Sequence, residues 1–423
     1  MSTLASFNPF DAETLQCPHS HYAQMRDAEP VLHLPDLGMY LVTRHDLVLT
    51  ILRDTTTYSS KFGRATMPLT GDDLTMYEAV VAEGYPRVPT MLTADPPEHT
   101  RYRGLVAKAF NIRTIAAMEP FVRRTVVELI EAWGQRETIE FVADFAVPLP
   151  VQVIATMLSQ PPERYGDIKR WSDANTAGIG TNLSVEGRCA AEREVNEFQR
   201  HFEREIDDRR LHPRDDLLSN LVHATIDDRS LALPEILSII SQLMVAGNET
   251  TTKLLAEMMR LLGERPDEWQ AVRDDPTRIE RVVEESLRLS SPTQGIFRIT
   301  TAAVTLGGVD IPAGARLVMV YGSANRDEAV FDDPDQFCPD RSRLKEQIAF
   351  GKGIHFCLGA ALSRLEARVA LEELSQRIPS FRLAASNDFR YFPSFMLRGL
   401  LRLDLELQTG SATAERPSRY GPP

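Results

Sequence analysis

The stretch "FGKGIHFCLGAALSRLEARVALEEL", residues 350–374, places a histidine and a cysteine among three glycines, directly before a helical pattern. The pattern's apolar stripe consists of Leu358, Leu362, Leu365 and Val369. A helix is therefore expected over 358–376. Its N-terminus would offer free backbone N–H groups and the positive end of the helix dipole to Cys357. Both would stabilise a thiolate and lower the pKa of the cysteine.

The glycines around Cys357 suggest a close approach by a flat group. Gly351 and Gly353 permit a tight, irregular backbone, and Gly359 clears the first turn of the helix. A lone cysteine is more often a small buried hydrophobe. Here, however, a thiolate held by amides suits a metal in a planar macrocycle. It suits a nucleophile less well, because no general base follows the cysteine in sequence.

Composition limits the class of protein. The chain has 423 residues, of which 43% are hydrophobic and 25% charged, with a formal net charge of −13. This charge argues against bulk attraction to nucleic acid or to an anionic membrane. The N-terminus shows neither a signal peptide nor a membrane anchor. The four cysteines form no C-x-x-C pair and favour a reducing cytoplasm; they are Cys17, Cys189, Cys338 and Cys357.

The rest of the chain predicts one mostly helical domain with small β elements over 1–408, followed by a disordered tail over 409–423. The longest helical run, 233–266, is apolar enough to cross the centre of the molecule. The other expected elements are a hairpin at 31–46, a long loop at 62–92 with a short helix near 72–83, helices at 98–134, 151–158 and 277–290, a charged and mostly solvated helix at 186–210, and β structure at 304–320.

The motif F-G-x-G-x-H-x-C-x-G resembles the haem-binding loop of the cytochrome P-450 family. It comprises Phe350, Gly351, Gly353, His355, Cys357 and Gly359. The resemblance implies that Cys357 is the axial thiolate ligand of the iron of haem b, to which it donates electron density. It also implies that Phe350 shields the thiolate from water. The implied fold is a triangular helical prism with small sheets, in which haem lies between the long central helix and the helix after the cysteine.

The stretch "AGNETTT" interrupts the longest helix with small and polar residues at 246–252. Ala246 and Gly247 could mark a close helix crossing. Alternatively, Thr250 bonds back to the carbonyl of Ala246 and opens a space for a diatomic ligand. Glu249 and Thr250 then place an acid beside an alcohol, as proton delivery to dioxygen requires. The stretch is similar to the family's A-G-x-[DE]-T signature, and the pair favours a monooxygenase.

Two further sets of residues match the family in chain order. Glu285 and Arg288 form an E-x-x-R pair, which alone is usually a solvated i,i+3 pair. With Arg341 from "FCPDR" they are similar to the family's buried ionic triad, which is structural. By resemblance, the contacts to the haem propionates are His99, Arg103, Arg298 and His355, although such cations could also form an exposed charged stripe.

The resemblance implies a monooxygenase that inserts one oxygen atom into a C–H or C=C bond of a lipophilic small molecule. Terpenoids, steroids, fatty acids and polyketide-like molecules all remain open. The pocket is expected to draw on the segments 62–92 and 173–184, although each residue could equally be ordinary core. The individual pocket candidates are Leu243, Thr293, Gln294, Ile296, Phe297 and Phe395.

Electrons are expected from a separate ferredoxin with its reductase, because no flavin or iron–sulfur domain is fused to the chain. A basic face made by Arg113, Lys352, Arg364 and Arg368 would suit an acidic ferredoxin, and a scattered solvated set of charges is the alternative. We expect a monomer. Two other classes remain open: a haem sensor or carrier without catalysis, against which the acid–alcohol pair argues, and a helical scaffold without a cofactor.

Overall fold

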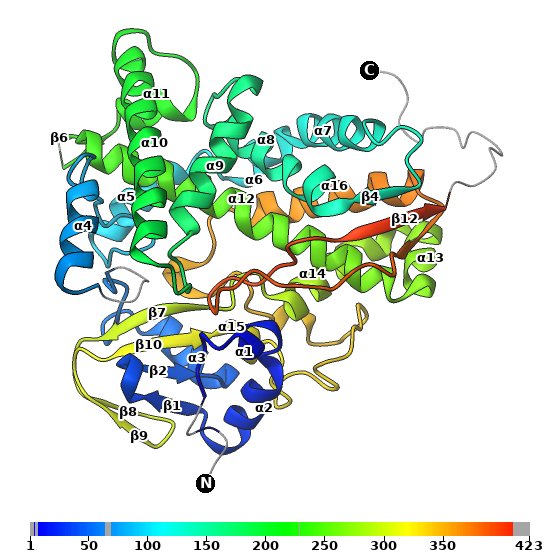
Figure 1. Cartoon of the computed structure of the whole chain (residues 1–423), viewed down its shortest axis with the longest axis horizontal. Coiled ribbons are helices and arrows are strands. Elements are labelled where there is room, and N and C mark those ends of the chain that lie inside the picture. The colour runs from blue at the N-terminus through cyan, green and yellow to red at the C-terminus, as the bar shows by residue number, and fades with distance from the viewer. Residues whose placement is uncertain (1–3, 5–6, 64–68, 228, 409–423) are drawn as a thin grey trace.

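Helices form the larger part of the molecule, and a sheet with short helices forms the smaller part beneath it (Figure 1). The computed structural model describes residues 4, 7–63, 69–227 and 229–408. The predicted tail at 409–423 and residues 64–68 of the predicted loop therefore lie outside the described residues. A mostly helical fold with small sheets is what the sequence predicted.

The predicted helices are present with small shifts at their ends, except that the helix expected over 98–134 is divided into three helices, at 98–107, 112–117 and 119–131. The α-helices are α1 (Ala12–Gln16), α2 (His19–Ala28), α3 (His45–Arg53), α4 (Gly71–Val81), α5 (Glu98–Ala107), α6 (Ile112–Ala117), α7 (Glu119–Glu131), α8 (Pro148–Met157), α9 (Tyr165–Thr176), α10 (Val185–Leu211), α11 (Leu217–Val222), α12 (Leu233–Gly263), α13 (Pro266–Asp274), α14 (Ile279–Ser290), α15 (Tyr321–Ala324) and α16 (Ala360–Arg377). The helix after Cys357 thus begins two residues later than expected.

The longest helix, α12, runs through the middle of the helical part (Figure 1). Its 31 residues correspond to about 46 Å. Pro234 lies in its first turn, and the side chain of Glu235 accepts a hydrogen bond from the N–H of Ala232 at 2.7 Å. These features start a helix efficiently. Because α12 packs against α8, α9, α14 and α16, most of its residues are buried.

The main sheet has five strands in the order β1-β2-β10-β7-β3. The predicted hairpin at 31–46 is its β1–β2 pair, and β2 continues into the sheet by parallel pairing with β10. The strands of the structure are β1 (Val31–Leu34), β2 (Met39–Val42), β3 (Tyr58–Ser59), β4 (Thr138–Glu140), β5 (Thr225–Ile226), β6 (Arg229–Ser230), β7 (Gly295–Thr300), β8 (Val304–Leu306), β9 (Val309–Ile311), β10 (Arg316–Val320), β11 (Ser380–Leu383) and β12 (Asp404–Gln408).

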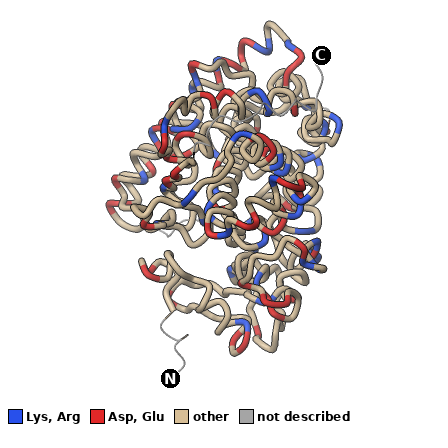
Figure 2. Tube along the Cα trace, turned by 90° about the vertical axis from the view of Figure 1, so that its right-hand side faces the viewer, with Lys and Arg blue, Asp and Glu red and all other residues tan. Residues whose placement is uncertain are grey.

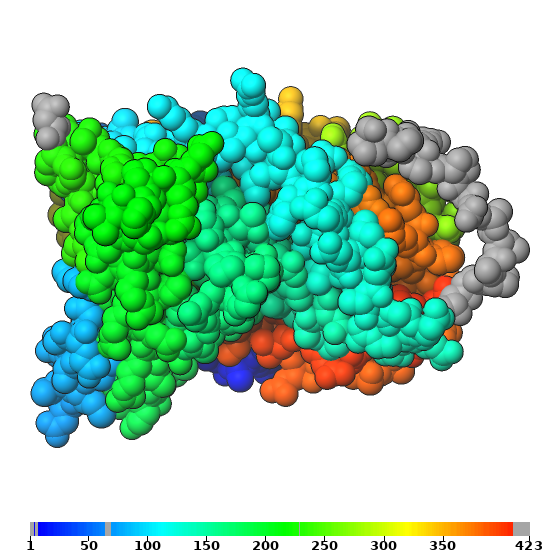
Figure 3. Space-filling model, turned by 90° about the horizontal axis from the view of Figure 1, so that it is seen from above, coloured from blue at the N-terminus to red at the C-terminus, as the bar shows by residue number. Residues whose placement is uncertain are grey.

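Helix α10 is less solvated than its charged sequence suggested. With the neighbouring α4 and α11, it forms one end of the molecule (Figure 3). Its buried apolar residues are Val185, Cys189, Val195, Phe198, Phe202 and Ile206, which recur every three to six positions on one side. The expectation of a mostly solvated helix was wrong, because charged residues on the outer face outnumber and obscure this stripe in the sequence.

Positively and negatively charged residues alternate along the trace in the helical part of the molecule (Figure 2). Many of them form ion pairs, so the net charge of −13 does not gather on one face in this view. Among the described residues, none of the helices combines the length and the apolar character that crossing a membrane requires.

Candidate functional site

The loop before α16 has a backbone that only glycine can form at one position. The N–H of Cys357 donates to the carbonyl of Phe350, and the N–H of Gly351 donates to that of Ile348, both at 2.9 Å. Gly353 has φ +73°, and a Cβ atom there would lie 2.5 Å from the carbonyl oxygen of Leu52. A side chain at position 353 would therefore collide with the backbone of the last turn of α3, and the loop requires this glycine.

The surroundings of Cys357 differ from the sequence-based expectation in one respect. Burial raises the pKa of the Cys357 thiol, while the N–H groups of Gly359 and Ala360 and the charges of Arg103 and Arg364 lower it only in part. The helix start does supply backbone N–H groups, as expected. However, they lower the pKa of Cys357 by less than the burial of the thiolate raises it. A bound metal cation overcomes this effect of burial, because it deprotonates a coordinating thiol.

Four nitrogen-bearing side chains gather beside this loop. The rings of His99 and His355 have centroids 4.2 Å apart. Arg103 donates to the carbonyl of Phe356 at 2.6 Å, and Arg298 donates to the carbonyl of the preceding Phe297 at 2.8 Å. Helix α5 and strand β7 thus bring His99, Arg103 and Arg298 to His355, although they are far apart in the chain.

The electrostatics of this group call for an anion. His99 is 2% exposed, and neither of its ring nitrogens has a hydrogen-bond partner within the described residues. Burial lowers the pKa of His99, as do Arg103 and Arg298. Burial, together with Arg298, His99 and Arg103, lowers the pKa of His355 to about 3. Burial also lowers the pKa of Arg298. Carboxylates would relieve this mutual repulsion and satisfy the unpartnered nitrogens.

These residues fit a haem. The buried, unpartnered nitrogens of His99 suit the propionates. A Cβ atom added at Gly359 would meet no heavy atom within 4 Å, so the first turn next to Cys357 is open to a flat group. Phe350, which the sequence predicted as a shield, is half-buried and lies under the guanidinium of Arg364, 4.6 Å from the ring centroid.

The small residues of α12 have two different environments. Thr250 Oγ1 donates to the carbonyl of Ala246 at 3.0 Å, and Ala246 is exposed. A Cβ atom on Gly247, by contrast, would lie 3.1 Å from Ile154 of α8. The structure thus brings Ala246 and Thr250 together at an open part of the helix. Gly247 lies where α8 and α12 pack closely, which is the close helix crossing that the sequence offered as an alternative to a ligand space.

The carboxylate of Glu249 is surrounded by charged groups. Lys253 Nζ lies 2.7 Å from Oε2, and Lys169 Nζ lies 3.7 Å from Oε1. Burial acts to raise the pKa of Glu249, but Lys253 and Lys169 outweigh it and lower that pKa. Asp173 of α9, which pairs with Lys169, has its pKa raised by burial. The acid predicted for proton delivery is therefore an ionised group held by two lysines.

Glu249 also lines a cavity of about 450 Å³. Helix α9 and the turn after it contribute to the lining of this cavity, as do residues near the N-terminus and residues of the loop that begins at Phe392. Its lining residues are Phe10, Leu15, Asp173, Thr176, Ala177, Thr181, Asn182, Leu183, Glu249, Phe392 and Pro393. Part of the segment predicted for the pocket at 173–184 contributes to this lining.

Glu285, Arg288 and Arg341 lie together in the interior. Arg288 donates two hydrogen bonds of 2.8 Å to the Glu285 carboxylate, and both side chains are fully buried. Arg341 Nε lies 3.5 Å from Glu285 Oε1, which also accepts from the N–H of Cys338 at 2.9 Å. These contacts join α14 to the segment that precedes the Cys357 loop.

The six pocket candidates lie in different places. Leu243 belongs to the apolar core that is formed mainly by residues of α8 to α12. Thr293 pairs with Leu397 in an isolated β-bridge. The ring of Phe297 packs against Phe62 and lies 6.2 Å from the ring of Phe395, and Ile296 packs against the same apolar cluster. Because side chains alternate across a strand, Phe297 and Arg298 point to opposite faces. Three of the six, Ile296, Phe297 and Phe395, thus lie together, whereas Leu243 belongs to a different part of the core.

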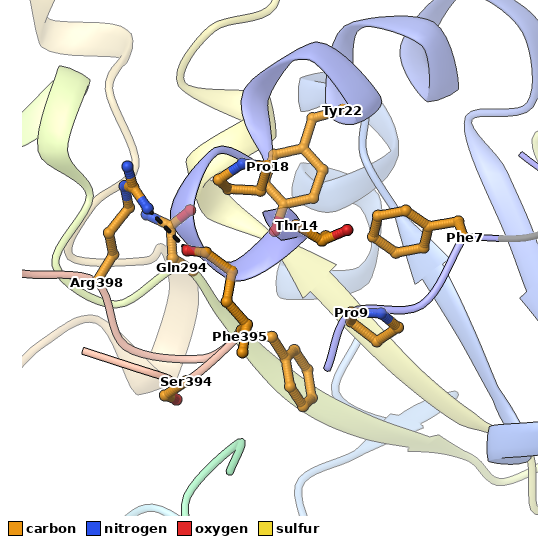
Figure 4. A pocket seen from close by; sticks show the side chains of 10 residues that line it. Phe7, Pro9, Thr14, Pro18, Tyr22, Gln294, Ser394, Phe395 and Arg398 are labelled. Atoms are coloured by element: carbon orange, nitrogen blue, oxygen red, sulfur yellow. Dashed lines mark hydrogen bonds between the residues drawn. The ribbon is translucent and has the colours of Figure 1, made fainter. Parts of the chain in front are cut away.

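Gln294 and Phe395 line a small cavity of about 10 Å³ together with Phe7, Tyr22 and Arg398 (Figure 4). Such a volume holds about one water molecule. The amide of Gln294 donates to the carbonyls of Ser290 and Ser291 and ties the residue to the end of α14.

The expected basic face is largely neutralised. Arg364 pairs with Glu284 at 2.5 Å, and Arg368 pairs with Glu119 at 2.6 Å and Glu372 at 2.7 Å. In the described part of the chain, Arg113 is exposed without an ion pair, and Lys352 is half-buried. The expectation that all four would form a basic surface was wrong for the two arginines of α16, because glutamates from neighbouring helices lie against them.

Several residues of the site were missed in the sequence. Ser60 Oγ lies 2.9 Å from Nε2 of His355, and Lys169 and Lys253 lie against Glu249. A signal existed only for Lys253, which follows Glu249 by four positions on a helix and so meets it on one face. The others come from distant segments with no local pattern to mark them.

Comparisons with known proteins agree with this geometry. A family profile for Cytochrome P450 matches residues 151–386. Cytochrome P450 107B1 of Saccharopolyspora erythraea is 36% identical over 93% of this chain and 96% of its own length. Erythromycin C-12 hydroxylase of the same organism is 38% identical over 88% of this chain and 90% of its own.

A solved structure shows the same fold. CYP109E1 of Bacillus megaterium, in complex with testosterone, superposes with a TM-score of 0.83 and 32% identity, covering 94% of this chain and all of that one. The Cys357 loop, the cluster of nitrogen-bearing side chains and the pair of Glu249 and Thr250 thus occur on the fold that the resemblance implied. The chain belongs to the cytochrome P450 family, whose members are haem-binding monooxygenases of the oxidoreductase class.

Proposed function

We propose that this protein inserts one oxygen atom from dioxygen into a C–H or C=C bond of a lipophilic small molecule, by hydroxylation or epoxidation. The observation that carries the proposal is the bond from Thr250 to the carbonyl of Ala246, one residue after Glu249, in the open part of α12. The names of its relatives support a bulky lipophilic substrate, since one hydroxylates erythromycin and one was crystallised with testosterone.

The residues that would hold the haem follow from the site. Cys357 would bind the iron through Sγ, and His99, Arg103, Arg298 and His355 would hold the propionates. Bound haem supplies the iron at which dioxygen is activated with two electrons. Leu243, Thr293, Ile296, Phe297 and Phe395 remain candidates for substrate contact, and Gln294 is the weakest, because its amide is already bonded to the end of α14.

Thr250 and Glu249 would handle protons. The Thr250 hydroxyl can exchange its bond to Ala246 for one to a water molecule, and so direct a proton to the outer oxygen atom of dioxygen. The carboxylate of Glu249 can take up protons from water in the cavity beside α9. Without this delivery, electrons would leave as hydrogen peroxide and not as product.

The test is Thr250→Ala, which keeps the helix because alanine is the better helix former. We expect normal haem content, near-normal substrate binding and a shift from product to peroxide per electron consumed. Thr252→Ala is the matched control, since the hydroxyl of Thr252 is buried and has no partner among the described residues. Unchanged coupling in Thr250→Ala would refute the proton-delivery role, and loss of coupling in both variants would show a mere helix effect.

The iron ligand is tested separately. The reduced protein under carbon monoxide should show the red-shifted Soret band of thiolate ligation, and Cys357→Ala should lose it. Cys338→Ala is the control. If the Cys357 variant keeps the band, the assignment is wrong.

We further propose that a ferredoxin with its reductase supplies the electrons, in a reducing cytoplasm where the four cysteines stay free. The partner would dock near Arg113 and Lys352, beside the loop of Cys357. Because Arg364 and Arg368 are neutralised by glutamates, attraction at this face would depend on few charges. Reduction of the haem by several purified ferredoxins, at increasing salt, tests this choice of partner.

A further inference from the structure

A buried lysine beside the proton-delivering acid has no role in the function described so far. Lys253 is 6% exposed and Glu249 is 8% exposed. The ammonium of Lys253 lies 2.7 Å from Oε2 of Glu249 and 3.4 Å from its carbonyl oxygen. Burying an ammonium group is costly, and a pair of this kind persists only when its geometry is well supported.

The C-terminal loop at residues 392–399 supports Lys253 in two ways. A Cβ atom at Gly399 would lie 2.1 Å from Cγ of Lys253, so only glycine lets the lysine stem pass. The ammonium lies 5.2 Å from the ring centroid of Phe392, a distance suited to a cation–π contact. The N–H of Phe392 donates to the carbonyl of Gly399 at 2.9 Å and closes the loop.

The position of Lys253 fixes the direction of the Glu249 side chain. Consecutive residues on an α-helix point about 100° apart, so Glu249 faces α9 while Thr250 faces the open part of α12. The other charged groups that face Glu249 come from α9: Lys169, 3.7 Å from Oε1, and Asp173, which is bonded to Lys169. Lys253 is the closer of the two cations, and Phe392 and Glu249 line the same 450 Å³ cavity.

We propose that Lys253 is a positioning residue for proton delivery, which holds the Glu249 carboxylate in the wall of the cavity beside α9, with the loop 392–399 holding Lys253 in turn. This inference rests on the proposed function. Lys253 itself transfers no proton. It keeps the ionised carboxylate of Glu249 in contact with cavity water. From this water Glu249 can take up a new proton after each turnover.

The first test compares Lys253→Met, Glu249→Gln and the double variant. A correctly placed proton-transfer group contributes roughly 10²–10⁴-fold to a rate, so each single variant should lower product per electron by at least about tenfold and raise peroxide. If Lys253 acts only through Glu249, the double variant is no worse than Glu249→Gln alone. The carbon monoxide band and substrate affinity should stay unchanged in all three.

A second test needs no turnover. The infrared carboxylate bands of Glu249, identified by subtraction of Glu249→Gln, report its ionisation in protein with and without haem. Because Lys253 and Lys169 lower the pKa of Glu249 against burial, Lys253→Met should move its titration to higher pH. Lys169→Met should move it less, because the charges are 3.7 Å apart and not 2.7 Å. Gly399→Ala should act like a mild Lys253→Met by displacing the lysine stem, and it carries the test if Lys253→Met does not fold.

The control is Arg260→Met, which breaks the 2.7 Å pair with Glu257 on the same helix and should leave coupling unchanged. The inference is overturned if Glu249 titrates at the same pH without Lys253, or if the double variant loses clearly more product than Glu249→Gln. If Glu249→Gln itself stays coupled, the proposed function of the acid fails, and that outcome is distinct from the failure of Lys253 alone.

Discussion

Arg288→Met offers a direct measure of how strongly the interior of the molecule supports the Cys357 loop. Arg288 donates to the Glu285 carboxylate through two bonds of 2.8 Å. It also donates to the carbonyls of Asn325, Pro334 and Gln336, at 2.8, 2.7 and 3.1 Å. One side chain therefore joins α14 to three points of the segment that leads to the loop.

The expected loss is large. Removing one partner of a buried ion pair costs about 3–5 kcal/mol, because the other charge stays buried without compensation. After Arg288→Met, Glu285 would retain only the Cys338 N–H at 2.9 Å and Arg341 at 3.5 Å. The buried carbonyl of Asn325 and the partly buried carbonyl of Pro334 would lose a donor as well. Since folded proteins are stable by only about 5–15 kcal/mol, the variant should lose haem and unfold at much lower denaturant concentration.

The assay is guanidinium unfolding at neutral pH, followed by the Soret band and by circular dichroism. Glu285→Met/Arg288→Met should be more stable than Arg288→Met by about 1 kcal/mol or more, because no unpaired charge is then buried. Arg382→Met is the control, since its 3.0 Å pair with Glu406 is exposed and should contribute less than about 1 kcal/mol. A loss below about 1 kcal/mol in Arg288→Met, or a double variant less stable than the single, would refute the reasoning.

Three further expectations follow from other contacts. Gly353→Ala should lower haem retention and unfolding free energy by about 2 kcal/mol or more, since φ is +73° and the new Cβ would meet a backbone oxygen at 2.5 Å; Gly308→Ala, with φ +82° but open space, should cost less. Arg229 and Tyr102 lower the pKa of Glu235 to about 2, against an ordinary value of 4.5. The stabilisation of the folded protein by ionised Glu235 is therefore fully present above pH 4.5 and is lost as the pH falls towards 2. Glu235→Gln should therefore destabilise the protein by about 1–2 kcal/mol at pH 7 and hardly at all at pH 2, and equal destabilisation at both would contradict this. Arg113→Glu should slow reduction by an acidic ferredoxin at low salt, whereas Arg364→Met should change it less than about twofold; the reverse order would show that Arg364 is free to meet the partner.

The elements that sequence reasoning predicted well depend on local patterns. The 31 residues of α12, the hairpin of β1 and β2 and the helix after Cys357 are all marked by periodicity and by residues that start or stop elements. The glycine positions before Cys357 were predicted for the same reason, because a positive φ is a local property of the chain.

The parts that were mispredicted depend on neighbours from distant segments. The neutralisation of Arg364 by Glu284 and of Arg368 by Glu119 cannot be read from α16 alone. The raised pKa of Cys357 reflects burial by the whole fold, which outweighs the local amides. Lys169 approaches Glu249 from a helix about eighty residues earlier in the chain, and one sequence gives no sign of that contact.

The parallel pairing of β2 with β10 has a consequence for synthesis. Met39 pairs with Arg316, 277 residues later in the chain. Since ribosomes add about 5–20 residues per second, strand β10 is synthesised about 15 to 55 seconds after the N-terminal hairpin of β1 and β2. During that time the apolar residues Leu41 and Val42 have no partner on that edge. His99, Arg298 and Cys357 also emerge in sequence, so the cofactor can be captured only after nearly the whole chain has left the ribosome, and loading it is among the last events of maturation.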